Sequence, residues 1–495
     1  MARRPRRPVP KPDGMFDRNV EWSELTAFAG NPQPGPSLGV VSGRRRQGKS
    51  FLLDSLAEAT GGFYFQALEA SRSESLAMLG RAVADYAGRS VPDRPGNWAE
   101  AVDLLFDLGR ETPTVVVLDE FPYLARADDS LPSALQAAIG TRTPRHLTRS
   151  PRLLLCGSAL SFMGGLLSGT SPLCGRAGLN LVVQSLPYRQ AAAFWGIGDP
   201  RLAVLTHAVV GGTPAYRNEF VAGDTPEGFA DFDAWMCRSV LNPASAIYGE
   251  APFLLAAESE LRDRSLYHSV LAAVAQGNET SGGIANYLGR PRTDAALPLT
   301  VLRNCGLIAV EDDVFRRNRP RYRVAEPLIA FHHAVVRPEQ AAFDRRRTSA
   351  AWARSQDTFL SKVVGPHFEH LCREWVLDHA DPATFGGMPV RAAAGTVADP
   401  EARTSHEVDV VVHGAVGQDT GVLLSVGEVT WGRLMDLPDL ARLHHILGLL
   451  TARGIDTVHA LPACYSGVGF TPALRAAEGR GEVVLVDLER VYGGE

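Results

Sequence analysis

Lysine is almost missing from this chain. All but three of its 50 lysine and arginine residues are arginine, and the three lysines are Lys11, Lys49 and Lys362. Any step that needs a lysine ammonium is therefore confined to three positions, so the surroundings of each lysine are informative.

Signals for membrane insertion, secretion and disulfide bonding are missing as well. No apolar run reaches the roughly 18 residues that indicate a membrane span. The basic start, MARRPRRPVPK, is not followed by the apolar core of a secretory signal. Residues 1–14 are expected to form a disordered basic tail, and contact with nucleic acid or an acidic partner is the alternative. The six cysteines form no C-x-x-C pair and indicate neither a zinc ribbon nor a disulfide scaffold. We expect a cytoplasmic protein without a membrane partner.

Length and charge narrow the class of protein further. A chain of 495 residues is long enough for about three or four domains. Its apolar fraction of 45% and charged fraction of 21% are ordinary for a globular protein. The net charge of −5 excludes a strongly basic nucleic-acid binder overall, but it is compatible with a local basic patch.

Residues 43–50, GRRRQGKS, fit the G-x-x-x-x-G-K-[ST] pattern of a P-loop. The run SLGVVS before them predicts a buried strand, and SFLLDSLAEA after them has helical spacing. Backbone N–H groups of such a loop surround a β-phosphate, and the helix dipole adds positive charge. Lys49 is then expected to reach the β- and γ-phosphates of ATP and Ser50 to bind Mg²⁺, unless this is a surface turn that matches by chance. The predicted ATP-binding residues of the loop are Gly43, Arg44, Arg45, Arg46, Gln47, Gly48, Lys49 and Ser50.

Two acids follow a second apolar run, TPTVVVLDEF, in which they are Asp119 and Glu120. A parallel strand that ends in this way places both acids at the carboxyl edge of the sheet, where ligands bind. Asp119 is expected to act through the Mg²⁺ shell, and Glu120 to orient or deprotonate the attacking water. Acids at strand ends are common, so the pair gains its meaning from the P-loop that precedes it.

Two further residues are weaker candidates for catalysis. Ser158 ends a third predicted strand, PRLLLCGS; its hydroxyl either contacts the γ-phosphate or the water, or caps the helix that follows. Arg176, in SPLCGRAGL, precedes another strand-like run, LNLVVQSLP. A bridging arginine can neutralise charge in the transition state. Because arginine is so abundant here, this role rests mainly on a family resemblance.

The order of these segments resembles that of the prokaryotic AAA-type ATPases in the STAND group of P-loop enzymes. The P-loop and LDEF are the specific elements, and looser matches occur in MFDRNVEWSEL, VVGGTPAYR and YRVAEPLIAFHHAVVRP. The family's box before the P-loop is matched by Phe16, Arg18 and Leu25, so the resemblance implies that Phe16 and Arg18 contact the nucleotide. Its lid motif is matched by Gly211, Gly212 and Pro214.

The resemblance also implies the architecture. The nucleotide domain, over 15–190, should be a five-stranded parallel sheet with an added strand between the P-loop strand and the acidic strand. A helical lid over 191–255, a winged helix over 256–335 and a restriction-endonuclease-like α/β domain over 356–495 should follow. The expected fold class is thus a multidomain α/β protein of the P-loop NTPase type.

A basic hairpin is predicted near the middle of the chain. SGGIANYLG and DAALPLTVLRNCG have the pattern of a helix-turn-helix, and LIAVEDDVFRRNRPRYRVA that of a wing. Five arginines in this wing could bind a DNA backbone. The alternative is that the wing packs on a neighbouring domain, since acids at 311–313 offset its charge. The five are Arg316, Arg317, Arg319, Arg321 and Arg323.

The C-terminal part carries three acids that match the PD-(D/E)xK nuclease core in order. They are Glu369 in PHFEHLCREWV, Asp409 in HEVDVVVHG and Glu428 in LLSVGEVTWG. In such enzymes the acids hold Mg²⁺ beside the scissile phosphate. The family's lysine, two residues beyond the last acid, is replaced here by Thr430.

The shortage of lysine decides how this site is interpreted. No lysine follows Lys362, so none can take the missing position from a neighbouring element. Arg433 could supply charge, but an arginine cannot act as a neutral base. We therefore expect a degenerate nuclease fold that serves as a binding or structural module.

The predicted function is ATP binding and slow, Mg²⁺-dependent hydrolysis, used as a conformational switch that is coupled to DNA, to a protein partner or to self-association. Two alternatives remain open. One is a non-hydrolysing DNA-binding regulator that uses ATP only to hold a shape, and the other is a nuclease effector gated by ATP.

Overall fold

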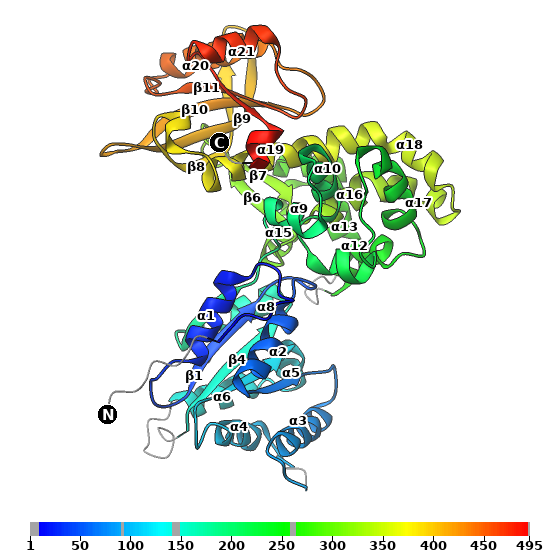
Figure 1. Ribbon diagram of the computed structural model, residues 1–495, viewed down its shortest axis with the longest axis vertical. Coiled ribbons are helices and arrows are strands. Elements are labelled where there is room, and N and C mark those ends of the chain that lie inside the picture. Colours follow the sequence, from blue (N-terminus) through cyan, green and yellow to red (C-terminus); the bar gives the residue numbers. More distant parts are fainter. Residues whose placement is uncertain (1–8, 91–93, 141–148, 258–263, 494–495) are drawn as a thin grey trace. The chain divides into compact units, whose positions relative to one another are not determined.

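The chain divides into two units, Met1–Ser185 and Leu186–Glu495, which Figure 1 shows as a ribbon coloured along the sequence. A computed structural model of the protein describes residues 9–90, 94–140, 149–257 and 264–493. Each unit is described by itself below. Within these ranges, no helix combines the length and the apolar character that crossing a bilayer requires.

The first unit is built on a parallel five-stranded sheet in the order β2-β3-β4-β1-β5. β4 lies between the P-loop strand β1 and the acidic strand β3, so the expected five-stranded sheet with its added strand is confirmed. The strands are β1 (Ser37–Ser42), β2 (Phe63–Gln66), β3 (Thr114–Asp119), β4 (Pro151–Gly157) and β5 (Ala177–Val182).

Helices cover both faces of this sheet, which is why its central strands are apolar at nearly every position. Alternate residues of β3 belong to different clusters: Val115 and Val117 pack with α1 and α2, whereas Val116 and Leu118 pack with the remaining helices. The helices are α1 (Asn19–Ala29), α2 (Lys49–Thr60), α3 (Arg72–Tyr86), α4 (Trp98–Asp107), α5 (Phe121–Ala127), α6 (Leu131–Gly140) and α8 (Leu160–Leu166).

The segment before α1 is held in place from Val9 onward. The Val9 carbonyl accepts a hydrogen bond from Trp22 Nε1 at 3.0 Å. Lys11 Nζ donates to the Asp17 carbonyl and to Asn19 Oδ1, both at 2.6 Å. The disordered tail expected over 1–14 therefore does not extend over residues 9–14, and its residues 1–8 lie outside the described residues.

The second unit begins with a helical region and ends with a sheet. Its largest hydrophobic cluster contains residues of both parts, from Tyr188 to Val491. The segments that the sequence separates as lid, winged helix and C-terminal domain thus share one continuous core. The helices are α9 (Tyr188–Trp195), α10 (Pro200–Val210), α11 (Phe232–Trp235), α12 (Glu250–Ala257), α13 (Arg264–Ala275), α14 (Ser281–Leu288), α15 (Arg292–Asn304), α16 (Pro327–Phe331), α17 (Arg337–Asp344), α18 (Thr348–Thr358) and α19 (Gly365–Asp378).

Short 3-10 and π-helical turns connect several of these helices. They are Tyr216–Phe220, Phe229–Asp231, Met236–Val240, Ala246–Gly249, His332–Val336, Phe359–Val364 and Pro382–Phe385. A two-stranded antiparallel hairpin, β6 (Ile308–Asp312) with β7 (Pro320–Val324), follows α14 and α15 at the place of the predicted wing.

A second sheet closes the chain, in the order β12-β11-β10-β9-β8. β8, β9 and β10 form an antiparallel meander, and β11 and β12 continue the sheet in parallel to β10. α19 packs on one face and α20 and α21 on the other. The elements are β8 (Met388–Asp399), β9 (Thr404–Val416), β10 (Asp419–Thr430), α20 (Leu437–Ala452), β11 (Leu461–Ser466), α21 (Pro472–Gly479), β12 (Val484–Asp487) and α22 (Leu488–Gly493).

Candidate active site

The loop between β1 and α2 has a backbone that its glycines make possible. Gly43 has φ 152°, and a Cβ at this residue would lie 2.4 Å from the carbonyl oxygen of Val183. Gly48, which precedes α2, has φ 84°, also in the region that favours glycine. The first N–H groups of α2 have no partner within the helix and lie beside this loop. The arrangement is a ready site for an anion.

Lys49 is the first residue of α2 and is only 5% exposed. Its Nζ donates to the carbonyl of Arg44 at 2.7 Å, so the ammonium extends across the loop. Burial lowers the pKa of Lys49, while the nearby Cys156, Glu120 and Asp119 act in the opposite direction. A buried ammonium next to the first N–H groups of a helix is suited to bind a phosphate, whose charge would offset the cost of burial.

Asp119 ends β3 and is 1% exposed. Its Oδ2 accepts a hydrogen bond from the Tyr64 hydroxyl at 2.7 Å, and its Oδ1 accepts one from the backbone N–H of Glu120 at 2.9 Å. Burial, and then the hydrogen bond to Asp119, raise the pKa of Tyr64, and a hydrogen bond with the Ser50 side chain opposes this shift. Tyr64 therefore connects Ser50 and Asp119, the two expected Mg²⁺ ligands.

Tyr64 is a member of the site that sequence reasoning missed. It lies on β2, the neighbour of β3, and is paired with Val117 in a register that also pairs Gln66 with Asp119. The alternating run FYFQ marks β2 as a strand, but nothing local to it indicates which strand it pairs with. Only the sheet order brings Tyr64 to the acids.

Glu120 and Ser158 meet at the carboxyl edge of the sheet. The Ser158 hydroxyl lies 3.2 Å from both carboxylate oxygens of Glu120. Glu120 has φ 50° and precedes α5, a left-handed conformation that is uncommon for a residue with a side chain. α8 begins at Leu160 and its N-cap is Ala159, so the Ser158 hydroxyl binds Glu120 instead of capping that helix.

The segment before α1 also reaches the P-loop. Arg18 is 8% exposed, and its guanidinium donates to the carbonyl of Gln47 at 3.2 Å and to Glu21 at 2.8 Å. Gln47 is buried, and its Oε1 has no hydrogen-bond partner among the described residues. Phe16, two residues before Arg18, is 42% exposed, so an aromatic side chain lies on the surface close in sequence to the Arg18–Gln47 hydrogen bond.

Arg176 is not brought to these residues. It is exposed and comes just before β5, and its guanidinium lies beside Gly140 at the end of α6. β5 runs parallel to β1 with Ala177 opposite Leu38, so Arg176 is at the amino edge of the sheet and the P-loop is at the carboxyl edge. Six residues of strand separate the two edges by about 20 Å.

In the second unit, two of the five hairpin arginines are engaged in protein contacts. Arg321 forms ion pairs with Glu279 and with Glu407 of β9. Arg323 pairs with Glu311 at 3.4 Å, and its guanidinium lies 3.2 Å from Nε2 of His370 on α19. For these two arginines the structure favours the packing alternative.

The other hairpin arginines lie at its tip, and Arg317 and Arg319 are exposed. Asp313 holds the tip to β8, since its carboxylate accepts hydrogen bonds from the backbone N–H groups of Arg316 and Thr396 at 2.9 and 3.2 Å. A contact with DNA stays a prediction for Arg316, Arg317 and Arg319.

The three nuclease-like acids lie on α19, β9 and β10. Burial, and then the charge of Asp409, raise the pKa of Glu369 to about 8. Burial also raises the pKa of Asp409, whose Oδ2 accepts a hydrogen bond from the N–H of Val429 at 2.8 Å. Glu428 is paired with Arg442 of α20, a residue that sequence reasoning did not single out.

The lysine that the nuclease family has beside these acids is not replaced by another lysine, since none follows Lys362. Arg442 also donates to the carbonyl of Glu407 at 2.8 Å, so it joins α20 to β9 and β10. Arg433 pairs with Asp439 at 2.6 Å and is thereby directed to the start of α20. Thr430, the last residue of β10, has only a hydroxyl to offer.

Comparisons with known proteins bear on the fold of the chain. No family model matches the chain. A curated relative is the uncharacterized protein MJECL04 of Methanocaldococcus jannaschii, 24% identical over 351 residues, which are 68% of this chain and 72% of the relative. Among solved structures, the Walker-type ATPase PABY2304 of Pyrococcus abyssi aligns with a TM-score of 0.51 and 22% identity, over 66% of this chain and 99% of that chain.

A second solved structure, the ORC2 protein of Aeropyrum pernix, aligns over 68% of this chain and 96% of that chain with 15% identity, but its TM-score is only 0.41. The likeness to the Pyrococcus protein therefore carries the comparison. It shows that about two thirds of the chain shares the fold of that protein.

Proposed function

We propose that this protein binds ATP with Mg²⁺ at the P-loop, hydrolyses it slowly and uses the cycle as a conformational switch. The observation that carries the proposal is the convergence of Lys49, Asp119, Glu120 and Ser158 at one edge of the first sheet, around a loop built for an anion. Each of these groups has a separate task in phosphoryl transfer to water.

The resting contacts indicate what changes when ATP arrives. Lys49 exchanges its bond to the Arg44 carbonyl for the β- and γ-phosphates, and the N–H groups of α2 donate to the same anion. Ser50 and Asp119 are the residues that would hold Mg²⁺, which neutralises phosphate charge, and both are released from Tyr64 to do so. Glu120 then orients the attacking water and accepts its proton.

Ser158 gives a physical reason for slow turnover. Its hydroxyl donates to the carboxylate of Glu120, the group that must accept a proton from water. A carboxylate that accepts such a hydrogen bond is a weaker base. A partner or DNA that turned Ser158 toward the γ-phosphate would free Glu120 and accelerate hydrolysis.

Arg176 fits a role on a neighbouring copy. It cannot reach the P-loop of its own sheet, because the two lie at opposite edges. Its exposure permits it to approach the nucleotide of a second chain, where it would neutralise transition-state charge. Hydrolysis would then depend on self-association.

The second unit is proposed to couple this switch to DNA or to a protein partner. α14, α15 and the β6–β7 hairpin have the order of a winged helix, and the exposed Arg317 and Arg319 supply its positive tip. The final sheet is proposed to be a degenerate PD-(D/E)xK fold, because Glu428 is paired with Arg442 and no lysine is at hand.

The test of the phosphate site uses two substitutions of one residue. Lys49→Ala should abolish binding of a fluorescent ATP analogue. Lys49→Arg should also lose most of the binding, because a guanidinium is larger than an ammonium and planar. Arg110→Ala, which removes an exposed cation of the same unit that pairs with Asp107, should leave binding unchanged. Normal binding and hydrolysis of ATP by Lys49→Ala would refute the assignment.

The nuclease alternative is tested with plasmid and linear DNA, Mg²⁺ or Mn²⁺, and ATP. We expect no cleavage, because the site has no lysine and Arg442, the arginine at Glu428, is already engaged in an ion pair. Nicking that is lost in Asp409→Ala and in Glu428→Ala would overturn this expectation. Cleavage gained in Thr430→Lys would show that only the lysine was missing.

A further inference from the structure

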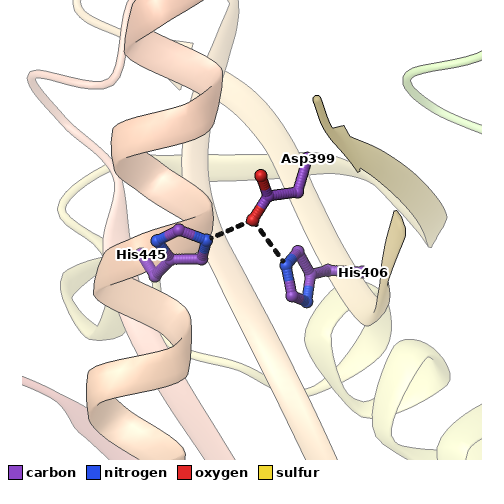
Figure 2. Close-up of side chains that lie close together, drawn as sticks. All are labelled: Asp399, His406 and His445. Atoms are coloured by element: carbon purple, nitrogen blue, oxygen red, sulfur yellow. Dashed lines mark hydrogen bonds and ion pairs between the residues drawn. The ribbon is translucent and has the colours of Figure 1, made fainter. Parts of the chain in front are cut away.

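Three side chains outside the nucleotide site converge at one corner of the final sheet (Figure 2). Asp399 is the last residue of β8, His406 lies near the start of β9, and His445 is on α20. His406 is paired with Val397, so it projects from the same face as Val397 and Asp399, the face that α20 covers. None of the three belongs to the acid cluster of Glu369, Asp409 and Glu428.

Both imidazoles present the same nitrogen to the same oxygen. Nε2 of His445 lies 2.8 Å from Oδ2 of Asp399, and Nε2 of His406 lies 3.3 Å from it. One nitrogen of each histidine and one carboxylate oxygen all lie within 4.8 Å of one another. The two rings are almost perpendicular, at 85°, with their centres 5.3 Å apart. The three potential ligand atoms thus form a compact triangle.

The two sides of this triangle that meet at Asp399 are close in length to those of a tetrahedral metal site. With metal–ligand distances of about 2.0–2.2 Å, neighbouring ligand atoms of a zinc site lie about 3.3–3.5 Å apart. The His406 contact already has that length. His445 would have to withdraw by only about half an ångström to match this spacing, and its side chain is 52% exposed and has room to move.

The surroundings supply what a metal site needs besides its ligands. Oδ1 of Asp399 accepts a hydrogen bond from the N–H of Ala402 at 3.0 Å, which fixes the carboxylate and leaves Oδ2 for a metal. Asp399 is 5% exposed whereas His445 faces solvent, which gives an ion a path of entry.

From this geometry we propose that Asp399, His406 and His445 bind one Zn²⁺ ion, with a water in the fourth position. Two neutral imidazoles and one carboxylate are a donor set that zinc prefers. The ion would clamp the β8–β9 turn to α20, joining residues that are far apart in the sequence. Without metal, the same side chains are held by the hydrogen bonds that Figure 2 marks.

The experiment is a zinc titration of the full chain after treatment with a chelator, read by competition with a chromophoric indicator. The parent should bind one Zn²⁺ that the variants lose. Because loss of an outer-shell partner alone costs about 10–100-fold in metal affinity, His406→Ala and His445→Ala should each weaken this site at least tenfold. His444→Ala is the matched control, since it removes the exposed imidazole next to His445 on α20.

A second variant guards against loss of fold. Asp399→Asn keeps an oxygen for the N–H of Ala402 but removes the charge, so it should retain the parent's circular dichroism while losing zinc affinity. Co²⁺ in place of Zn²⁺ should give the visible absorption of a tetrahedral ion in the parent and lose it in His445→Ala. The proposal is overturned if the parent binds no zinc, or if His444→Ala weakens binding as much as His445→Ala does.

Discussion

Glu120→Gln is the substitution that separates a slow ATPase from a regulator that only binds ATP. Glutamine has the size of glutamate and keeps an oxygen that can accept the Ser158 hydrogen bond. The contacts of Asp119 with Tyr64 and with the backbone of residue 120 involve no atom of the Glu120 side chain. ATP and Mg²⁺ should therefore bind as before.

The expected loss is in the chemical step. A positioned general base contributes about 10²–10⁴-fold to a rate, which corresponds to about 2.7–5.4 kcal/mol of transition-state stabilisation. Phosphate release should be measured in a single turnover with protein in excess, and binding with a fluorescent ATP analogue. Glu111→Gln, at an exposed glutamate of the same unit, is the control. If parent and Glu120→Gln hydrolyse ATP at the same negligible rate, with DNA and without it, the non-hydrolysing regulator replaces the ATPase.

Ser158→Ala extends the same measurement to the partner of Glu120. If Ser158 restrains the base in the resting state, its removal should raise the basal rate and lower any stimulation by DNA. A hydrogen bond to a charged group contributes about 1.5–3 kcal/mol, so the change should be about tenfold to a hundredfold. In a background of Glu120→Gln the serine substitution should have little further effect, because residues that act through one another are not additive. An equal effect in both backgrounds would show that Ser158 acts independently.

Three further outcomes are expected. Tyr64→Phe should lower the Mg²⁺ concentration that supports half-maximal ATP binding, because the Tyr64 hydroxyl donates a hydrogen bond to Asp119, the proposed Mg²⁺ ligand, at rest. A higher Mg²⁺ concentration for half-maximal binding would contradict this. Arg176→Ala and Glu120→Gln should each be slow alone and recover part of the activity when mixed, whereas no recovery would place Arg176 outside catalysis. Alanine at both Arg317 and Arg319 should weaken DNA binding evenly across sequences and reduce its salt slope by about 2, as loss of two phosphate contacts requires; unchanged affinity at two salt concentrations would remove DNA from the hairpin.

Local motifs account for the part of the site that the sequence predicts. Gly43, Gly48 and Lys49 lie in one turn between a strand and a helix, so their spacing alone specifies the geometry. Asp119 and Glu120 could be placed because a buried apolar strand must end at the edge of its sheet. The five-stranded sheet with its added strand follows from the same runs once the resemblance supplies their order.

What could not be predicted depends on which elements become neighbours. Tyr64 reaches Asp119 only because β2 pairs with β3. Arg442 reaches Glu428 across 14 residues that include a turn and part of a helix, and Arg321 reaches Glu407 across 86 residues. The triangle of Asp399, His406 and His445 joins the end of β8, the start of β9 and α20. The spacing of these three residues in the sequence matches no local metal-binding motif. Each contact is set by tertiary packing, about which a single sequence carries little information.

The P-loop and the nuclease-like acids, the two proposed phosphate sites of this chain, differ in the cation that lies beside them. At the P-loop the cation is enclosed, 5% exposed and close to a loop carbonyl, where a compact ammonium fits and a planar guanidinium does not. At the nuclease-like acids the cation is arginine, and Arg442 uses two guanidinium nitrogens to join Glu428 to the backbone of β9. A fork of donors suits such a fixed link between elements, but it cannot give up a proton. Of the three lysines of this chain, one thus lies at the proposed phosphate site, whereas an arginine forms the ion pair at Glu428.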